Sequence, residues 1–202
     1  AGFGRCGEWF AVQRWQVTPD LITFAKGVNS GYVPLGGVAI NARIAATFAD
    51  RAFPGGLTYS GHPLACAAAV ASIQVIEEEG LIDNARRLGR DVIGPALRAL
   101  SERHPSIGDV RGVGCFWAVE LVRDRATREM LVPFNASGPD AAPMSRVAAA
   151  CKERGVWPFT HFNRFHVAPP INSDDDDIRR AVAALDEALA SGSPLRMGQR
   201  IG

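Results

Sequence analysis

The stretch PDLITFAKGVNSGYVPLGGVAI, residues 19–40, decides how this chain folds. It opens with a short apolar run, Leu21 to Ala25, behind the turn signal Thr18-Pro19-Asp20. Residues that favour tight turns crowd the part that follows, namely Gly27, Gly31, Pro34, Gly36 and Gly37. This pattern predicts a buried strand that runs into a tightly folded loop.

A lysine stands where the predicted strand meets the loop. Lys26 and Lys152 are the two lysines of the chain, so 20 of its 22 basic residues are arginines. Arginine does not lose its proton in a protein, whereas a desolvated lysine can, and its amine then attacks a carbonyl carbon. Lys26 is therefore a candidate nucleophile. The alternative is an ordinary lysine at a strand end, with its ammonium group in water.

The same stretch resembles the active-site lysine segment of the class III (ornithine and omega) aminotransferases. The family pattern is P-D, an apolar strand, A-K-G and then G-x-x-P-x-G-G, which matches residues 19–37. These are fold-type I enzymes that use pyridoxal 5'-phosphate. The resemblance extends from Gly2 to about Ala190 and implies that Lys26 is the internal Schiff-base lysine. It also implies that the freed amine moves the proton between the substrate Cα and the cofactor C4′.

A second motif, Thr58-Tyr59-Ser60-Gly61-His62-Pro63, leads into a predicted helix over residues 63–79. Proline suits a first helical turn, and a Thr-, Ser- and Gly-rich turn there presents N–H and hydroxyl groups to an anion. The alternative is a plain helix cap. The family has T-x-x-G-[HN]-P at this place, and its threonine contacts the cofactor phosphate of the neighbouring subunit. By resemblance Thr58 binds the cofactor, and the enzyme is a homodimer with a shared active site.

The substrate-binding residues depart from the family pattern. Several class III enzymes place an arginine three residues before a Pro-Pro pair, where its forked guanidinium binds the substrate carboxylate. Here His166 holds that position before Pro169-Pro170, and Arg164 lies two residues earlier, on the same face of a strand. We expect Arg164 and His166 to bind substrate, the alternative for Arg164 being a surface residue or a structural ion pair. His166 also indicates a substrate other than an ordinary α-amino acid.

The first residues contain G-x-G-x-x-G at Gly2, Gly4 and Gly7, the pattern of a dinucleotide site. That site needs a strand before the first glycine and a helix after the last. No strand can precede Gly2 by one residue, and an NAD(P)-binding oxidoreductase leaves Lys26 and the Thr58 turn unexplained. The class III family has the sequence G-F-G-R-T-G at this place, and this chain has Cys6 where the family has Thr. A non-catalytic regulatory or scaffold domain is a third reading.

The family keeps the rest of its cofactor site in segments that would precede Ala1. These are a D-E-V segment with the aspartate that binds the pyridine nitrogen, a Gly-rich phosphate turn and an aromatic residue that stacks on the ring. We therefore expect the 202 residues to be a fragment of a longer enzyme, or half of an enzyme completed by another chain. We expect the chain to be inactive by itself.

The order of predicted elements is strand and helix alternation first, then a smaller sheet with helices, which is α/β followed by α+β. We assign residues 1–90 to part of the large cofactor-binding α/β domain, 91–190 to a small α+β domain and 191–202 to a tail. In the second part we expect a helix over 82–103, bent or split at Gly94-Pro95, and strands within 107–122. A helix over 144–154, strands at 156–159 and 165–168, and a helix over 174–190 capped from Ser173 follow.

Composition excludes several classes of function. The net charge is +1 with acidic and basic residues interspersed, which argues against nucleic acid or an anionic membrane as partner. The apolar stretch from Leu64 to Ile73 has about half the length that a bilayer span needs. The four cysteines and four histidines have no metal-ligand spacing, so we expect no metal, no disulfide framework and a cytoplasmic protein with reduced thiols.

Taken together, the sequence predicts a pyridoxal-phosphate-dependent aminotransferase that moves an amino group from an amine or amino acid to a 2-oxo acid. Aminomutase and racemase chemistry within the same family uses the same lysine. No residue of the chain separates these three reactions.

Overall fold

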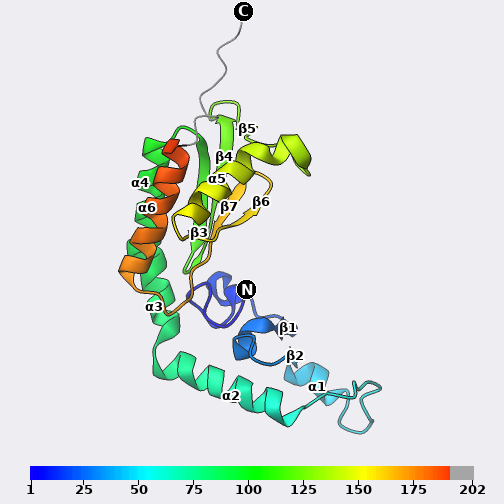
Figure 1. Ribbon diagram of the computed structural model, residues 1–202. Coiled ribbons are helices and arrows are strands. Elements are labelled where there is room, and N and C mark those ends of the chain that lie inside the picture. Colours follow the sequence, from blue (N-terminus) through cyan, green and yellow to red (C-terminus); the bar gives the residue numbers. More distant parts are fainter. Residues whose placement is uncertain (192–202) are drawn as a thin grey trace, which may run out of the picture. The chain divides into compact units, whose positions relative to one another are not determined.

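The computed structural model describes residues 1–191, which form two compact units, Ala1–Asn84 and a second unit that begins at Ala85 (Figure 1). Each unit is described by itself below. The predicted tail, 191–202, lies outside the described residues except for Ser191. The predicted boundary between residues 90 and 91 stays a prediction.

The first unit is built around a two-stranded antiparallel sheet. β1 (Leu21–Ala25) pairs with β2 (Gly36–Ile40) in a register that sets Phe24 opposite Gly37. A Cβ atom on Gly37 would lie 2.5 Å from the tip of the Phe24 ring, so a larger residue there would push that ring aside. The expectation of a buried strand is wrong for this unit. No residue of β1 is buried, because β2 is its only partner strand among the described residues and the two strands leave both faces partly open.

The N-terminal segment packs on this sheet through aromatic rings. The Phe3 ring meets the rings of Phe10 and Phe24 edge-on, at centroid distances of 5.4 and 5.9 Å. The next regular element after Gly7 is the short 3-10 helix η1 (Ala11–Trp15), four residues further on. The glycine pattern therefore does not open a helix as a dinucleotide site requires.

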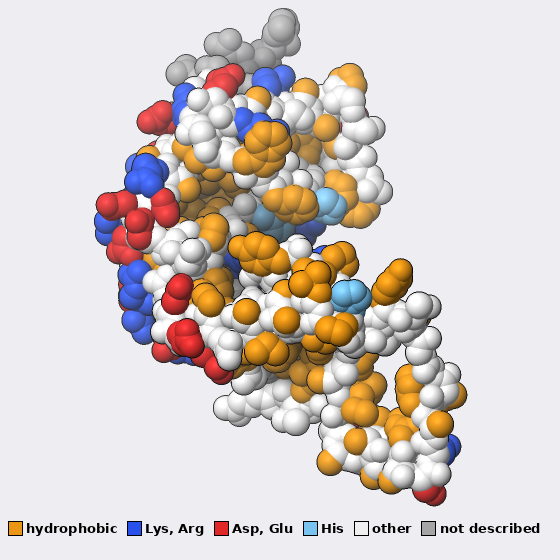
Figure 2. All heavy atoms as spheres, turned by 60° about the horizontal axis from the view of Figure 1, so that its bottom comes forward, with side chains coloured by type: hydrophobic (Ala, Val, Ile, Leu, Met, Phe, Trp, Pro, Cys, Tyr) orange, Lys and Arg blue, Asp and Glu red, His pale blue; other side chains and the backbone are white. Residues whose placement is uncertain are grey.

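Two α-helices complete the first unit. α1 (Ala42–Ala46) is a short helix, and α2 (Pro63–Glu78) confirms the predicted helix over 63–79 to within one residue. Only Ala65, Ala69 and Ile76 of α2 are buried. Large apolar side chains of this unit lie on the surface (Figure 2), among them Leu64, Val70 and Val75 on α2.

The predicted helix over 82–103 is split, as its Gly94-Pro95 pair indicated. α3 (Leu81–Arg87) leads into a π-helical turn, η3 (Leu88–Ile93), and α4 (Gly94–Arg103) follows. The backbone of Gly89 in the π-helical turn packs against the turn at Gly114. A Cβ atom on Gly89 would lie 2.4 Å from the Gly114 carbonyl oxygen, which explains the glycine.

The second unit holds an antiparallel sheet in the order β3-β4-β7-β6, with β5 paired to β4. Its strands are β3 (Ile107–Val113), β4 (Phe116–Asp124), β5 (Glu129–Met130), β6 (Phe159–His161) and β7 (Arg164–Val167). The predicted strands in 107–122 are confirmed. The predicted pair at 156–159 and 165–168 is a β6–β7 hairpin that begins at Phe159.

Helices cover one face of this sheet and form its hydrophobic core. α4, α5 (Ala142–Glu153) and α6 (Asp175–Ser191) supply the helical side, with η4 (Gly138–Ala141) leading into α5 (Figure 1). Trp117, Val119 and Leu121 of β4 point into the core, so the alternate residues Phe116, Ala118 and Glu120 lie on the other face. We call this second face, which belongs to β3, β4, β7 and β6, the outer face.

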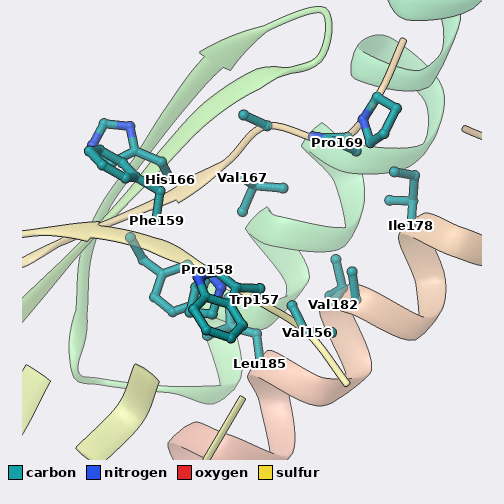
Figure 3. Close-up of a pocket in the computed structure, with 14 residues that line it drawn as sticks. Val156, Trp157, Pro158, Phe159, His166, Val167, Pro169, Ile178, Val182 and Leu185 are labelled. Carbon is teal, nitrogen blue, oxygen red and sulfur yellow. The ribbon is translucent and has the colours of Figure 1, made fainter. Parts of the chain in front are cut away.

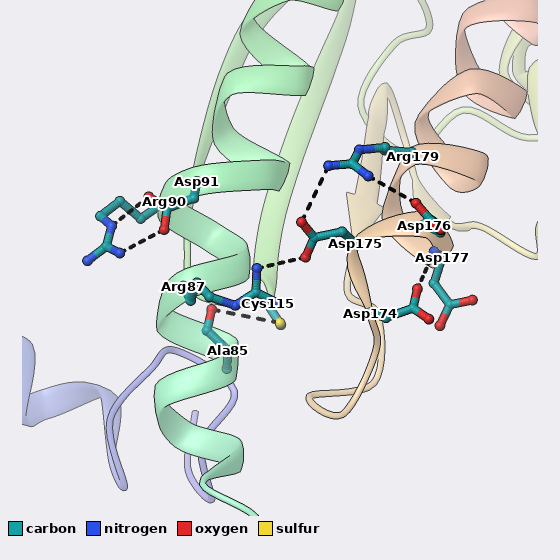
Figure 4. A network of polar contacts seen from close by, with 10 residues as sticks. All are labelled: Ala85, Arg87, Arg90, Asp91, Cys115, Asp174, Asp175, Asp176, Asp177 and Arg179. Carbon is teal, nitrogen blue, oxygen red and sulfur yellow. Dashed lines mark hydrogen bonds and ion pairs between the residues drawn. The ribbon is translucent and has the colours of Figure 1, made fainter.

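The start of α6 is anchored by its aspartates (Figure 4). Asp174 Oδ1 accepts the backbone N–H of Asp177 at 2.7 Å, so Asp174 supplies a capping side chain. α6 begins at Asp175, one residue after the predicted start, which makes Asp174 the N-cap residue. Asp175 accepts a 2.7 Å hydrogen bond from Arg87, which joins α3 to α6.

Candidate functional site

Lys26 follows the last residue of β1 and opens the 3-10 turn η2 (Lys26–Asn29). Its backbone lies in the left-handed region, with φ of 54°. That conformation is uncommon outside glycine and costs energy, and such strain is concentrated at functional positions. The Lys26 carbonyl oxygen accepts the N–H of Ser30 and of Gly31, so hydrogen bonds on the loop side hold the strained residue in place.

The Lys26 side chain is open to solvent. The residue is exposed, and within residues 1–191 its ammonium group has no hydrogen-bond or ion-pair partner. The first unit therefore does not supply the desolvating surroundings that the apolar sequence suggested. What it presents is an accessible amine on a constrained backbone.

Two residues that the sequence reasoning missed shape the loop around Lys26. Asn29 is 1% exposed, its Nδ2 donates to the Val33 carbonyl at 2.5 Å, and its Oδ1 accepts the Gly31 N–H at 3.2 Å. Phe3 covers Gly27, where an added Cβ would lie 3.2 Å from the Phe3 Cβ. The signal for Asn29 was a side-chain amide two residues before a glycine, which is the pattern of an Asx turn.

The Thr58 turn has free hydrogen-bond donors. Ser60 closes the turn, because its Oγ accepts the Leu57 N–H at 3.2 Å and its own N–H donates to the Leu57 carbonyl at 2.9 Å. Thr58 is exposed and has no hydrogen bond within the described part of the chain. The N-cap residue of α2, His62, makes no side-chain capping bond, so the positive end of this 16-residue helix is uncapped.

No hydrogen bond joins Thr58 to Lys26 among the residues that the structure describes. The Lys26 loop reaches α2 through Ser30, whose Oγ lies 3.1 Å from Ser72 Oγ. Ser72 is nine residues beyond Pro63, which places it roughly 14 Å along the helix axis from the first residue of α2. The Thr58 turn precedes Pro63, so the loop contacts α2 well away from the phosphate-binding candidate.

These two features fit the cofactor that the sequence implied. Pyridoxal 5'-phosphate requires a free amine for its aldehyde group and hydrogen-bond donors for its phosphate. Lys26 offers an unpaired amine, and the Thr58 turn offers a free hydroxyl beside an uncapped helix N-terminus. Both parts of the fit come from the first unit.

Arg164 and His166 lie in the second unit, on the outer face of β7. Arg164 Nη2 lies 2.9 Å from His161 Nδ1, and since guanidinium N–H groups can only donate, His161 Nδ1 is the acceptor. No carboxylate within residues 1–191 forms an ion pair with Arg164. Its cross-strand neighbour Glu120 is held instead by Arg111 at 2.5 Å.

His166 lies between two phenylalanine rings. The Phe116 ring is stacked on it at 6.3 Å with an interplanar angle of 22°, and the Phe159 ring is tilted against it at 5.1 Å. Burial lowers the pKa of His166, and the positive charge of Arg164 acts in the same direction. The imidazole is therefore uncharged at neutral pH, unlike the arginine that the family pattern would place there.

A cavity of about 270 Å³ borders this strand within the second unit. Apolar side chains line most of it, including those of Val156, Trp157, Val167, Pro169, Ile178 and Val182. Figure 3 shows the His166 and Phe159 rings together at one side of β7 and Val167 at the other, toward α6. His166 is thus at the border of the cavity.

Within residues 1–191 no three His, Cys, Asp or Glu side chains gather in a way that could hold a metal ion. None of the helices described is both long and apolar enough to cross a bilayer.

Comparison with known proteins gives one consistent result. The model of the family "Aminotransferase class-III" matches residues 1–189. Taurine–pyruvate aminotransferase from Bilophila wadsworthia (strain 3_1_6) is 34% identical over 203 aligned residues, which cover 94% of this chain and 42% of that protein. 4-Aminobutyrate aminotransferase from Escherichia coli (strain K12) is also 34% identical, with the same two coverages.

Among solved structures, taurine:2-oxoglutarate aminotransferase from Bifidobacterium kashiwanohense, in complex with PLP and glutamate, superposes with a TM-score of 0.89 at 35% identity. The match covers 96% of this chain and 43% of that one. The chain thus spans about two fifths of the length of the relatives it matches.

Proposed function

The chain belongs to the class-III aminotransferase family, and on this premise we propose that it carries the reactive lysine and one phosphate-binding turn of a pyridoxal-phosphate-dependent aminotransferase. The predicted resemblance is confirmed by the family match, and the predicted α/β fold is confirmed by the close superposition on a PLP-containing transaminase. The reaction is the transfer of an amino group from an amine or amino acid to a 2-oxo acid.

The observation that carries this proposal is the accessible amine of Lys26 on a strained backbone. When bound, pyridoxal phosphate supplies an electron sink for the substrate carbon. Lys26 Nζ would hold the cofactor, and its amine would accept and return the proton that moves during the amino transfer. Asn29 keeps the following loop folded, which keeps Lys26 at the strand end.

Thr58 and the N-terminus of α2 receive the phosphate group in this proposal. The hydroxyl and N–H donors are free, and the positive end of the helix favours an anion. Since the Lys26 loop contacts α2 roughly 14 Å from its first residue, we assign the two residues of one chain to two different sites. Each site of a homodimer then takes Lys26 from one copy and Thr58 from the other.

Arg164 receives the substrate carboxylate. It has no carboxylate partner among the described residues, and His161 accepts one of its N–H groups, which leaves the rest of the guanidinium fork for a ligand. The reducing, cytoplasmic setting suggested by the scattered cysteines stays a prediction.

The two lysines make a direct test. The purified protein is incubated with pyridoxal phosphate, reduced with borohydride and mapped by peptide mass spectrometry. We expect the pyridoxyl label on Lys26 and not on Lys152, whose ammonium group packs on the Trp157 ring at 3.9 Å. Lys26→Arg should abolish the label and Lys152→Arg should keep it. Equal labelling of both lysines would refute the assignment.

A complementation experiment tests the shared site. In an active enzyme that contains this chain, Lys26→Arg and Thr58→Ala are each expected to remove most transaminase activity. Mixed subunits of the two variants form one intact site and one doubly defective site, so an equal mixture should regain about a quarter of wild-type activity. If mixing restores no activity, then either the Lys26 and Thr58 of one chain serve the same site, or Thr58 does not bind the cofactor.

A further inference from the structure

The outer face of the second-unit sheet carries side chains that the core does not use. Cross-strand pairing sets His166 beside Ala118 on β4 and beside Phe159 on β6. The same register sets Arg164 beside Glu120 on β4 and beside His161 on β6. Two adjacent rows result, one around His166 and one around Arg164.

Aromatic rings surround His166, in a row that continues through Ala118 to Arg111 on β3. We call Phe116, His166 and Phe159 the ring stack, since both phenylalanine rings lie against the imidazole. Phe116 is 43% exposed and Phe159 is 65% exposed. Rings grouped on an open face, rather than scattered singly, indicate a surface that binds something apolar.

The row around Arg164 is polar, and its charges are unequally satisfied. Asp109 and Glu120 of this row both form ion pairs with Arg111, which lies one row away opposite Ala118. Those hydrogen bonds raise the pKa of Arg111. Arg164 has only the imidazole of His161 as partner among residues 1–191 and is the guanidinium open to a further anion.

The two rows define a spacing. Arg164 and His166 are two residues apart on β7, so about 7 Å separates the anion-binding group from the ring stack. Because burial lowers the pKa of His166, the ring stack carries no charge at neutral pH. A ligand that reaches both rows has a carboxylate at one end and an uncharged, apolar group at the other.

We propose that the ring stack of Phe116, His166 and Phe159 determines substrate specificity, selecting substrates with one carboxylate and an uncharged aromatic or arylalkyl end over dicarboxylic ones. This inference rests on the proposed function and adds to it the class of substrate. The rings bury the apolar end of such a substrate. A second carboxylate in the same place loses its hydration, and the guanidinium in that row, Arg111 opposite Ala118, is already paired with Asp109 and Glu120.

The first test is a ratio of specificity constants. In an active enzyme that contains this chain, we compare kcat/KM for phenylpyruvate with that for 2-oxoglutarate as amino acceptors. Phe116→Ala and Phe159→Ala should each lower the ratio about 10-fold, mainly through KM for phenylpyruvate. Phe134→Ala is the matched control, because Phe134 is 70% exposed in the same unit and packs on Phe162, outside the ring stack. An unchanged ratio in both variants would overturn the inference.

The second test restores a permanent charge. His166→Arg places a guanidinium between the two rings, so kcat/KM for 2-oxoglutarate should rise about 10-fold while that for phenylpyruvate falls. If kcat/KM fell by the same factor for both acceptors, His166 would not discriminate between them. That result would also overturn the inference.

The third test measures binding without catalysis. Imidazole resonances of the purified protein are followed by NMR during titration with phenylacetate or acetate. The His166 signals should shift with phenylacetate at concentrations where acetate has no effect, and the response should be lost in the Phe116→Ala, Phe159→Ala double variant. A His166 ring that responds to neither ligand, because protein covers the outer face, would overturn the inference.

These tests separate the two proposals. If Lys26 takes no pyridoxyl label but His166 still prefers phenylacetate, the proposed function fails while the ring stack keeps its binding role. If Lys26 is labelled and the protein transaminates but no variant alters the substrate ratio, the proposed function stands and the ring stack is rejected.

Discussion

The two units of the chain differ in how completely each buries its own apolar residues. The second unit has a continuous core in which Leu88, Ile93, Leu97 and Leu100 are fully buried. In the first unit few side chains are buried, and residues such as Leu21 and Leu64 are more than half exposed, at 55% and 63%. The unit that carries Lys26 therefore has the weaker core of its own, and the unit that carries Arg164 has the stronger.

The largest expected effect is the difference in stability loss between a leucine truncation in the second unit and one in the first. Leu97→Ala removes a fully buried side chain of the second unit and should lower the free energy of unfolding by about 2–5 kcal/mol. Leu64→Ala, the matched change at a 63% exposed position of α2, should alter it by less than about 0.5 kcal/mol. Urea unfolding of both variants measures the difference. Equal losses would mean that Leu64 is covered in the purified protein.

The rate of cysteine alkylation compares an exposed thiol of the first unit with buried thiols of the second. Cys66 on α2 is exposed, whereas Cys115 and Cys151 in the second unit are buried. Burial raises the pKa of Cys151 to about 11, so its reactive thiolate amounts to about one part in 1,000 at pH 8. Iodoacetamide at that pH should modify Cys66 at least about 100-fold faster than Cys151. Protection of Cys66, measured by mass spectrometry, would contradict the open surface of α2.

The smallest expected effect concerns an ion pair between α4 and α6. Asp186 accepts hydrogen bonds from His104 Nε2 at 2.5 Å and from Arg103 Nη2 at 2.6 Å. Asp186→Asn should cost about 1 kcal/mol at pH 7, since the carboxylate is partly exposed and screened by solvent. Glu187→Gln on the same helix is the control, because the Glu187 side chain is 68% exposed and its pairing with Arg154 should contribute little.

The pH dependence of this pair has a definite sign. The hydrogen bond from His104, followed by that from Arg103, lowers the pKa of Asp186 in the folded protein. A lowered carboxyl pKa adds stability above the ordinary pKa of an aspartate, and this stability is lost as pH falls through the lowered value. Asp186→Asn should therefore weaken the dependence of the free energy of unfolding on pH in the acid range. An unchanged profile would show that Asp186 is not paired in solution.

Local patterns predicted the elements of the chain well. The helix over 63–79 and the break at Gly94-Pro95 follow from proline and glycine positions, which act through the backbone of a few neighbouring residues. Burial was less predictable. The apolar run of β1 reads as a buried strand, yet its exposure depends on which other segments pack against it. The last helix begins one residue after its predicted start, because the start of a helix is uncertain by a residue or two.

By itself the sequence identified the family, which the family match confirms, and it predicted the reactive group. Lys26 within its glycine-rich segment, the Thr58 turn and the histidine before Pro169-Pro170 are all legible in the order of residues, because each motif is short and local. Only the tertiary structure decided what surrounds them. It set Phe116 against His166, 50 positions away, and gave Glu120 to Arg111 rather than to Arg164. The registers of β4 with β3 and with β7 fix those neighbours, and register depends on how the whole sheet packs on its helices.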